Sequence, residues 1–384
     1  MTTDLGAALR DATLASADAD LERLVAYARH ETPTGDRDAI DAFADTVATD
    51  AAALGATTRR LPLPHGDALL VEHPGSAARA DLRPALLLGH LDTVHPVGSL
   101  AGAVPLHTEG ELLHGPGVHD MKGGLVVVLA AWAALAAVGA PARAVRLLLT
   151  PDEEIGSPSS GHLVTAQAGQ VAYALGLEPP HRDGALKTSR RGSTRWRLQV
   201  TGRAAHAALD PESGVNAIDE LVDQLLVLRA VAAEHPDVLV NVGTVDGGGR
   251  TNVVPDAAEA EVGLRFVDAA TETVVLDRLA ALRPVRDGAV VAPRVMSRRP
   301  AWGPSTATER LLEAVAEAGR TVGQDVVGRP AAGAADTNLS GAAGIPSLDG
   351  FGPVGGGAHA AHEHVLIASL AQRAALLAAV LATA

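Results

Sequence analysis

The stretch "AVRLLLTPDEEIGSPSSG", residues 144–161, joins an apolar run to a turn that carries three consecutive acids. The run at 145–149 is typical of a buried strand, and a proline and a glycine close by supply the turn that ends it. Asp152, Glu153 and Glu154 then stand side by side, although adjacent carboxylates repel and persist only in water or beside a cation. By itself the segment allows two interpretations, a solvated acidic loop or part of a cation site.

Two further apolar runs end in the same way. "ALLLG" at 85–89 is followed by His90 and Asp92, and "VAYALGL" at 171–177 is followed by Glu178. Continuous apolar runs of this length fit buried strands of a mainly parallel sheet, in which ligands bind outside the carboxyl ends of the strands. Three strands therefore end in a potential metal ligand at one edge, which a solvated loop does not predict.

The composition narrows the class of protein. The 384 residues suggest two domains or one large domain, and 47% hydrophobic residues are ample for a core. The net charge is −14 and no dense basic run is present, so we expect no nucleic-acid partner. The chain has no cysteine, which excludes disulfides, thiol catalysis and Cys-ligated zinc. A metal site in this chain must use His, Asp and Glu.

One segment has to be weighed as a membrane span. "GGLVVVLAAWAALAAVGA" at 123–140 is uncharged over 18 residues, which is the threshold length for crossing a bilayer. Its glycine ends, with Asp120 and Lys122 just before it, favour a fully buried helix instead, and we expect no membrane partner. The N-terminus lacks the basic region and apolar core of a signal peptide, so we expect a cytoplasmic protein.

After Glu178 the pattern changes. Alternating strand-like segments and two helical segments, at 214–234 and 270–283, follow in the order β-α-β-β-α-β of a ferredoxin-like split unit. We expect an inserted α+β domain at 185–298. It interrupts an α/β domain made of residues 1–184 and 299–384.

Two glycine-rich segments complete the set of candidate ligands. Asp120 lies between glycine turns in "HGPGVHDMKGG" at 114–124, and His359 follows three glycines in "GPVGGGAHAAHEHV" at 352–365. With the strand-end residues, they provide two histidines and several carboxylates without any cysteine. This inventory suits a pair of zinc ions that keep open positions for water and substrate.

In this order and at this spacing, the motifs resemble the zinc aminoacylase and carboxypeptidase family, which includes carboxypeptidase G, acetylornithine deacetylase and succinyl-diaminopimelate desuccinylase. The resemblance runs from about Leu21 to the C-terminus, and "GPGVHDMKGGLV" and "LDGFGPVGGGAH" are most similar to the glutamate carboxypeptidase branch. It implies a mainly parallel-sheet catalytic domain with an inserted ferredoxin-like lid. It also implies two Zn²⁺ per subunit, replaceable by Co²⁺ or Mn²⁺, and a homodimer formed through the lid.

The resemblance also implies roles for the ligands. One histidine and one carboxylate for each zinc, together with a bridging aspartate, correspond to His90, His359, Asp120, Glu154 and Glu178. Asp92 matches the acid that orients His90, and Glu153 matches the general base. The peptide bond after the bridging aspartate is often cis in this family. Spacing alone leaves His362 as an alternative ligand to His359.

Further matches lie in the inserted domain. His206, in "GRAAHAALDP", matches a histidine that reaches the active site of the partner subunit and stabilises the oxyanion there. Asn252 and Arg265 match residues that receive the substrate's carboxylate, for which a guanidinium is suited. The alternatives are a surface histidine, a β-turn asparagine and a solvated strand arginine. Arg190 and Arg191 are looser candidates, for which we expect solvated side chains.

We therefore expect a hydrolase that cleaves an amide bond to an amino acid with a free carboxylate, with glutamate as the first choice. Its substrate is a small N-acyl amino acid or peptide. One alternative is an N-acyl-amino-acid deacylase with the same chemistry, and a remote one is a relative that binds amino acids without catalysis. Ala335 stands where the glutamate carboxypeptidase branch more often has a serine or threonine, so the amino acid recognised stays open.

Overall fold

The computed structural model describes residues 3–384, which divide into two compact units. Unit 1 contains the chain up to residue 189 together with residues 304–331 and 335–384, and unit 2 contains residues 190–303 and 332–334. Each unit has a hydrophobic core of its own.

The centre of unit 1 is an eight-stranded sheet with the order β1-β2-β6-β3-β7-β14-β8-β13. Its strands are β1 Thr57–Leu61, β2 Ala68–His73, β3 Ala85–His90, β6 Val145–Thr150, β7 Ala174–Gly176, β8 Leu186–Arg190, β13 Gly328–Ala331 and β14 Ser347–Asp349. The central strands β6, β3, β7 and β14 are parallel, while β1, β2 and β8 pair antiparallel. The three apolar runs of the sequence are thus parallel neighbours, as predicted, and their carboxyl ends meet at one edge.

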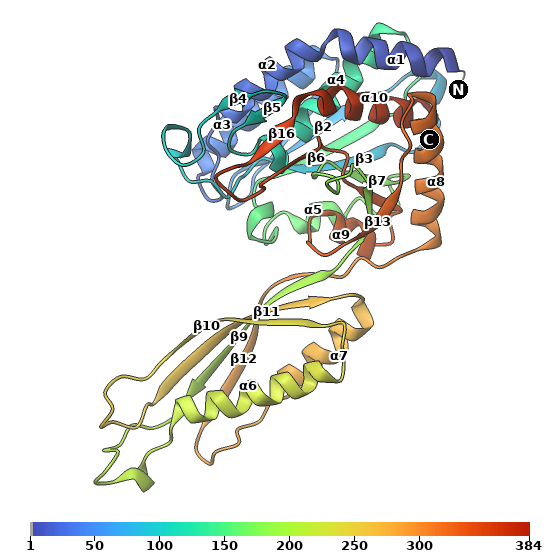
Figure 1. The fold of residues 1–384 in the computed structure, drawn as a ribbon. Helices are drawn as coiled ribbons and strands as arrows, with labels where there is room; N and C mark the ends of the chain where they lie inside the picture. The colour runs from blue at the N-terminus through green and yellow to red at the C-terminus, as the bar shows by residue number, and fades with distance from the viewer. Residues whose placement is uncertain (1–2) are drawn as a thin grey trace. The chain divides into compact units, whose positions relative to one another are not determined.

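Helices cover both faces of this sheet (Figure 1). The larger layer contains α1 Thr3–Ala15, α2 Ala17–Ala28, α3 Arg37–Ala53, α4 Gly123–Ala137, α8 Thr306–Thr321 and α10 Ile367–Thr383. The smaller layer contains α5 Gly161–Thr165 and α9 Thr337–Ala342. Side chains alternate between the two layers along a strand, so Leu87 packs in the larger core while Leu86 and Leu88 pack in the smaller one.

The apolar helix α4 is a core helix of unit 1. The segment Val118–Ala137 is long and apolar enough to cross a membrane, but 78% of its most apolar window is buried inside the protein. It packs against α10, α1 and α2. The prediction of a buried helix is confirmed.

A second, smaller sheet in unit 1 joins two glycine-rich segments. Its order is β15-β16-β5-β4, with β4 His107–Glu109, β5 Leu112–His114, β15 Gly355–Gly356 and β16 His364–Leu366. Asp120 follows β5 in the chain, and His359 lies between β15 and β16. The pairing of β5 with β16 therefore anchors the loops of these two candidate ligands beside one another.

Unit 2 is an antiparallel four-stranded sheet with the order β10-β11-β9-β12, covered by two helices. Its elements are β9 Gly192–Thr201, α6 Ala217–Ala233, β10 Leu239–Gly247, β11 Ala257–Phe266, α7 Ala269–Ala280 and β12 Val290–Arg299. The predicted order β-α-β-β-α-β is confirmed. Along β9, Trp196, Leu198 and Val200 are buried under the helices, which is the alternation of a half-covered sheet.

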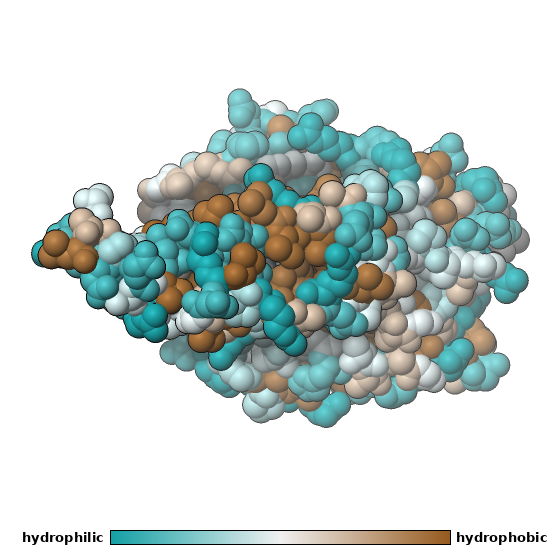
Figure 2. All heavy atoms as spheres, turned by 90° about the horizontal axis from the view of Figure 1, so that it is seen from below, coloured by the Kyte–Doolittle hydropathy of each residue, from teal (hydrophilic) through white to brown (hydrophobic). Residues whose placement is uncertain are grey.

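Unit 2 leaves hydrophobic side chains at its surface. Val222 and Leu226 of α6 are 50% and 56% exposed, and Leu239 and Val245 of the edge strand β10 are 52% and 61% exposed. Figure 2 shows hydrophobic side chains lying among hydrophilic ones on the surface seen from below.

Candidate active site

Two sets of histidine and carboxylate atoms meet at Asp120 in unit 1. His90 Nε2 lies 3.3 Å from Asp120 Oδ1 and 3.6 Å from Glu178 Oε1. His359 Nε2 lies 3.2 Å from Asp120 Oδ2 and 3.1 Å from Glu154 Oε2. Each set has three donor atoms within 4.8 Å of one another, and Asp120 belongs to both. This placement favours His359 over His362 as a candidate ligand.

The topology of the large sheet brings these residues together. His90 is the last residue of β3, Glu178 comes two residues after β7, and Glu154 lies in η4 (Glu153–Ile155) directly after β6. Because β6, β3 and β7 are parallel neighbours, the three side chains start from the same edge. Asp120 comes from η3 (Val118–Lys122), and the Asp120–Met121 peptide bond is cis, as the resemblance implied.

Asp92 holds two parts of the site at once. The ring Nδ1 of His90 donates to the backbone carbonyl of Asp92 at 2.8 Å and lies 3.4 Å from its carboxylate. That carboxylate also accepts hydrogen bonds of 3.2 Å from the backbone N–H groups of Glu153 and Glu154, and one of 2.7 Å from Thr34 Oγ1. Asp92 therefore orients both His90 and the acidic turn, and the sequence indicated only the first of these contacts.

The three consecutive acids have three different environments. Asp152 is fully buried and accepts hydrogen bonds from Ser159 and Ser160, so it stabilises the turn from inside. Glu153 is 7% exposed, and Glu154 belongs to the ligand set of His359. The interpretation as a solvated acidic loop is wrong, because the first two acids are buried.

A buried glutamate that the sequence analysis did not single out supports the Asp120 turn. Glu363 is 1% exposed and accepts hydrogen bonds from the backbone N–H groups of Gly117 (3.1 Å), His119 (2.9 Å) and Asp120 (3.0 Å). His95 Nε2 lies 2.6 Å from the same carboxylate. The one acid in the glycine- and histidine-rich segment 352–365 was the signal that could have revealed it.

The charges of the site fit a divalent cation. The carboxylates of Asp120 and Glu154 hydrogen-bond to His359 and raise its pKa to about 11. Burial raises the pKa of Glu178 well above its ordinary value, and the nearby carboxylates of Asp120 and Glu153 raise it further. Glu154 Oε1 is buried and has no hydrogen-bond partner among the described residues. A cation between the two sets offsets the repulsion of these acids and gives Glu154 Oε1 a partner, so these residues fit a metal centre.

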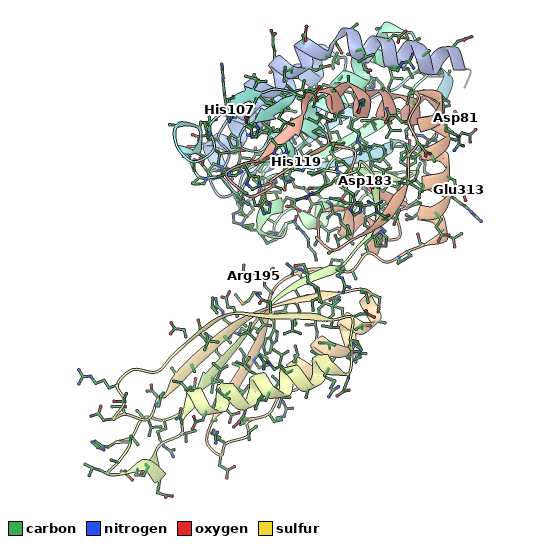
Figure 3. The ribbon with its side chains drawn as sticks, in the orientation of Figure 1. Asp81, His107, His119, Asp183, Arg195 and Glu313 are labelled. Carbon is green, nitrogen blue, oxygen red and sulfur yellow. The ribbon has the colours of Figure 1, made fainter. Side chains whose placement is uncertain are left out.

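Beside Asp120, His119 is an inward-facing neutral group (labelled in Figure 3). Burial lowers the pKa of His119 to about 4. Its Nδ1 is buried without a hydrogen-bond partner among the described residues, close to the backbone of Gly355.

His206 and Asn252 are neighbours in unit 2. The ladder between β9 and β11 continues beyond the named strands, and the backbone N–H of Ala207 donates to the carbonyl of Asn252 at 3.0 Å. The exposed His206 accepts bonds at Nδ1 from the backbone N–H groups of Ala208 and Leu209, at 3.2 and 3.1 Å. Its ring proton is therefore on Nε2, which faces away from these bonds and is a ready hydrogen-bond donor.

Arg265 lies at the other end of β11. It is half-buried and donates to Ser193, and both Arg265 and Arg299 pair in register with Ser193 on β9. Burial and the neighbouring Arg299 lower the pKa of Arg265, so an anion is favoured beside these two arginines. Of the looser candidates, Arg190 is not solvated: it is 4% exposed and donates to the carbonyl of Gly333 at 2.6 Å.

The length of β11 separates these two groups within one chain. Arg265 lies eight residues beyond Ala257, where β11 begins, and Asn252 lies before that start. At about 3.3 Å per residue, the two side chains start about 26 Å or more apart. One chain therefore does not bring Asn252 and Arg265 to the same small carboxylate.

Comparison with known proteins agrees with this architecture. The model of peptidase family M20/M25/M40 matches residues 86–383. The chain is 30% identical to carboxypeptidase G2 of Pseudomonas sp. (strain RS-16) over 368 residues, which cover 92% of this chain and 85% of that protein. It is 32% identical to succinyl-diaminopimelate desuccinylase of Maricaulis maris over 232 residues, which cover 56% and 57% of the two chains.

Solved structures share the fold at low sequence identity. Aminopeptidase PepT from Bacillus cereus superposes with a TM-score of 0.76 at 18% identity, covering 95% of this chain and 98% of that chain. The metallo-carboxypeptidase Sso-CP2 from Sulfolobus solfataricus gives a TM-score of 0.71 at 16% identity, with 95% and 98% covered. The family consists of metal-dependent hydrolases, which sets aside the alternative of a relative without catalysis. On the matched length and these relatives, the chain is an enzyme of peptidase or amidohydrolase type and belongs to the peptidase family M20/M25/M40.

Proposed function

We propose that the protein is a di-zinc hydrolase that cleaves the amide bond between an acyl or peptidyl group and an amino acid with a free carboxylate, glutamate first. The observation that carries the proposal is Asp120, whose two oxygens face two different histidines, each accompanied by a further carboxylate. One ion would be held by His90, Asp120 and Glu178, and the other by His359, Asp120 and Glu154. Co²⁺ or Mn²⁺ can substitute for Zn²⁺ in such a donor set.

Zinc, when bound, polarises the substrate carbonyl and makes water acidic enough to ionise near neutral pH. Glu153 is the general base of the proposal: it takes the proton of the attacking water and delivers it to the leaving amine. Its place supports this role, because it is next to Glu154 in the chain, is mostly buried and interacts electrostatically with Glu178. The hydrogen bonds from Glu153 and Glu154 to Asp92 hold the turn in place.

We also propose that the enzyme is a homodimer in which each unit 2 serves the partner's active site. Within one chain, His206 and Asn252 lie about 26 Å or more from Arg265, so a small substrate does not touch all three. In a two-fold dimer, His206 and Asn252 from one chain can meet a substrate that Arg265 of the other chain holds. The open edge of β10 and the exposed apolar residues of β10 and α6 support pairing at that surface.

In this arrangement Nε2–H of His206 stabilises the oxyanion, and Arg265 binds the substrate's carboxylate. The runner-up function is an N-acyl-amino-acid deacylase with the same centre, favoured by the likeness to succinyl-diaminopimelate desuccinylase. A cytoplasmic location remains our expectation.

A substrate panel tests the choice between these functions. Purified zinc-loaded enzyme is given peptides and acyl compounds that end in glutamate, matched N-acetyl and N-succinyl amino acids, and the carboxamide of each. We expect the highest kcat/KM on a glutamate-terminated substrate with a free α-carboxylate. Preference for N-acyl diamino acids supports the deacylase, and no turnover of any of these compounds contradicts both.

A further inference from the structure

A row of three histidines crosses the small sheet of unit 1. His114 on β5 pairs in register with His107 on β4 and with His364 on β16. Glu109 is two residues from His107 on the same strand. Because side chains directly opposite one another, and those two residues apart, point to the same face of a sheet, these four side chains share one face.

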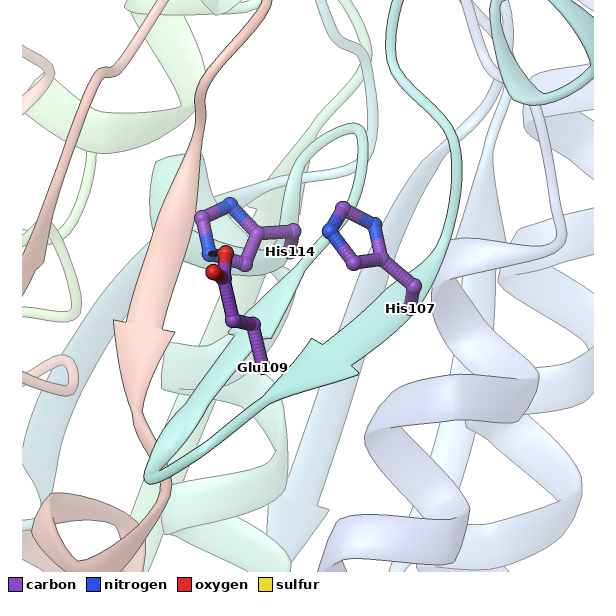
Figure 4. Close-up of side chains that lie close together, drawn as sticks. All are labelled: His107, Glu109 and His114. Atoms are coloured by element: carbon purple, nitrogen blue, oxygen red, sulfur yellow. Dashed lines mark ion pairs between the residues drawn. The ribbon is translucent and has the colours of Figure 1, made fainter.

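The side chains of this row are close together. The ring centroids of His107 and His114 are 4.8 Å apart and those of His114 and His364 are 5.2 Å apart. Glu109 Oε2 lies 3.9 Å from His114 Nε2. One donor atom each from His107, Glu109 and His114 fall within 4.8 Å of one another, and Figure 4 shows the three side chains gathered over β4 and β5.

Hydrogen bonds to backbone carbonyls fix which ring nitrogen carries the proton in two of these histidines. Nδ1 of His107 donates to the carbonyl of Pro105 at 2.9 Å, and Nδ1 of His364 donates to the carbonyl of His362 at 2.8 Å. Both rings therefore keep the lone pair on Nε2. Histidines that bind metals nearly always donate their other ring N–H in this way, which fixes the tautomer and the ring orientation.

His114, at the centre of the row, has a ring nitrogen that lacks a hydrogen-bond partner among the described residues. This nitrogen is Nε2, which is buried, while the side chain as a whole is 16% exposed. A buried polar atom without a partner costs free energy, about 1–3 kcal/mol in typical proteins, unless something binds it. A metal ion on the open side of the row, toward His107 and Glu109, supplies that partner.

We propose that His107, Glu109 and His114 form a divalent-metal site that is separate from the Asp120 centre, with His364 as a further imidazole in the same row. Two or three imidazoles and one carboxylate select a zinc-, nickel- or copper-class ion over Mg²⁺ or Ca²⁺, which prefer oxygen ligands. His107 and Glu109 are exposed, so an ion can reach them from solvent.

Such a site ties together the strands that lead into the active centre. An ion held by His107, Glu109 and His114 links β4 to β5. β5 runs into the loop of Asp120 and pairs with β16, which follows the loop of His359. We assign it a stabilising role: the ion links the sheet that anchors both loops and takes no part in the reaction.

The test counts bound metal by difference, so it does not depend on how many ions the Asp120 centre holds. Full-length protein, His107→Ala, Glu109→Gln and the control His162→Ala are dialysed to equilibrium against buffered Zn²⁺ and then against Ni²⁺, and metal per chain is measured by mass spectrometry. His162 is an exposed histidine on α5 and lies outside the row. We expect His107→Ala to bind one ion fewer per chain than the wild type and His162→Ala to bind the same number.

A second readout separates the row from the active centre. Starting from metal-free protein, added Zn²⁺ should raise the melting temperature of the wild type and of His162→Ala by more than that of His107→Ala, because only His107→Ala has lost the site at the row. Glu109→Gln, whose side chain keeps the size of the wild-type one, should need about tenfold or more additional metal to reach the same melting temperature. If His107→Ala does not fold, the metal count of Glu109→Gln decides the test. Equal metal counts in the wild type, His107→Ala and Glu109→Gln would overturn the proposal, and so would an equal loss in His162→Ala.

Discussion

The carboxylate of Glu363 accepts a 3.0 Å hydrogen bond from the backbone N–H of Asp120. The same carboxylate accepts hydrogen bonds from two further backbone N–H groups of the Asp120 turn and contacts His95. A buried, charged acceptor with this many donors fixes the turn that presents the proposed bridging ligand. Glu363 is therefore a positioning residue.

Glu363→Gln should weaken metal binding at the Asp120 centre by about 10–100-fold, because an amide nitrogen faces backbone N–H groups that need an acceptor. Zinc affinity is measured by competition with a chromophoric chelator, beside kcat at saturating metal. The control is Glu111→Gln, which changes an exposed glutamate in the connection between β4 and β5 and should alter neither quantity. Wild-type zinc affinity in Glu363→Gln contradicts the positioning role.

The buried His119 predicts a pH dependence of stability. Its pKa is about 4 in the folded protein and about 6.5 in an unfolded chain, so below pH 6.5 the unfolded chain binds the proton first. Stability is therefore lost as the pH falls from about 6.5 to 4, by up to about 1.4 kcal/mol per pH unit from this residue.

His119→Asn removes this contribution, so its free energy of unfolding should fall less steeply over that range. Urea unfolding of metal-free protein at pH 7.0, 5.5 and 4.5, with a chelator present, measures the slopes, and His162→Asn is the control. Parallel pH profiles for His119→Asn and the wild type mean that His119 is not the group that titrates.

Features that depend on short segments could be predicted from the sequence. Each of the strands β3, β6 and β7 is one apolar run followed by its own candidate ligand, so both the sheet and its functional edge follow from local patterns. Glu363 could not be assigned a role in this way, because its partners at Gly117, His119 and Asp120 are more than 240 residues away in the sequence.

The histidine row could not be predicted either, because its members come from segments far apart in the sequence. His107 and His114 are close in the sequence, but only the pairing of β16 with β5 brings His364 beside them. The resemblance pointed to Asn252 and Arg265 as residues for one carboxylate. The ladder of β11 shows that they lie at opposite ends of one sheet, a separation that motif spacing does not reveal.

If Arg265 binds the substrate's carboxylate, Arg265→Ala should lower kcat/KM for substrates with a free α-carboxylate and leave kcat/KM for their amides unchanged. The loss corresponds to about 1.5–3 kcal/mol of transition-state stabilisation. Arg195→Ala is the matched control, because Arg195 is an exposed arginine on β9 paired with Glu261 (labelled in Figure 3). Equal losses on acids and amides would assign Arg265 a structural role.

Mixed dimers test whether His206 acts across the dimer. Glu153→Ala and His206→Ala chains, each almost inactive alone, are unfolded together and refolded in equal amounts. Random pairing makes about half the dimers mixed, and each mixed dimer has one site without any mutation if His206 serves the partner, so about a quarter of wild-type activity should return. No recovery in a sample shown to contain mixed dimers contradicts the shared site.

The most direct test of the central claim compares the two neighbouring acids of the turn after β6. Glu153→Gln should keep the wild-type number of zinc ions and lose about 10²–10⁴-fold in kcat, because it removes proton transfer alone. Glu154→Gln should instead lose bound zinc, because it removes a ligand of the His359 set. Metal content and kcat measured on the same preparations decide: normal turnover in Glu153→Gln, or full zinc occupancy in Glu154→Gln, contradicts the roles proposed for this centre.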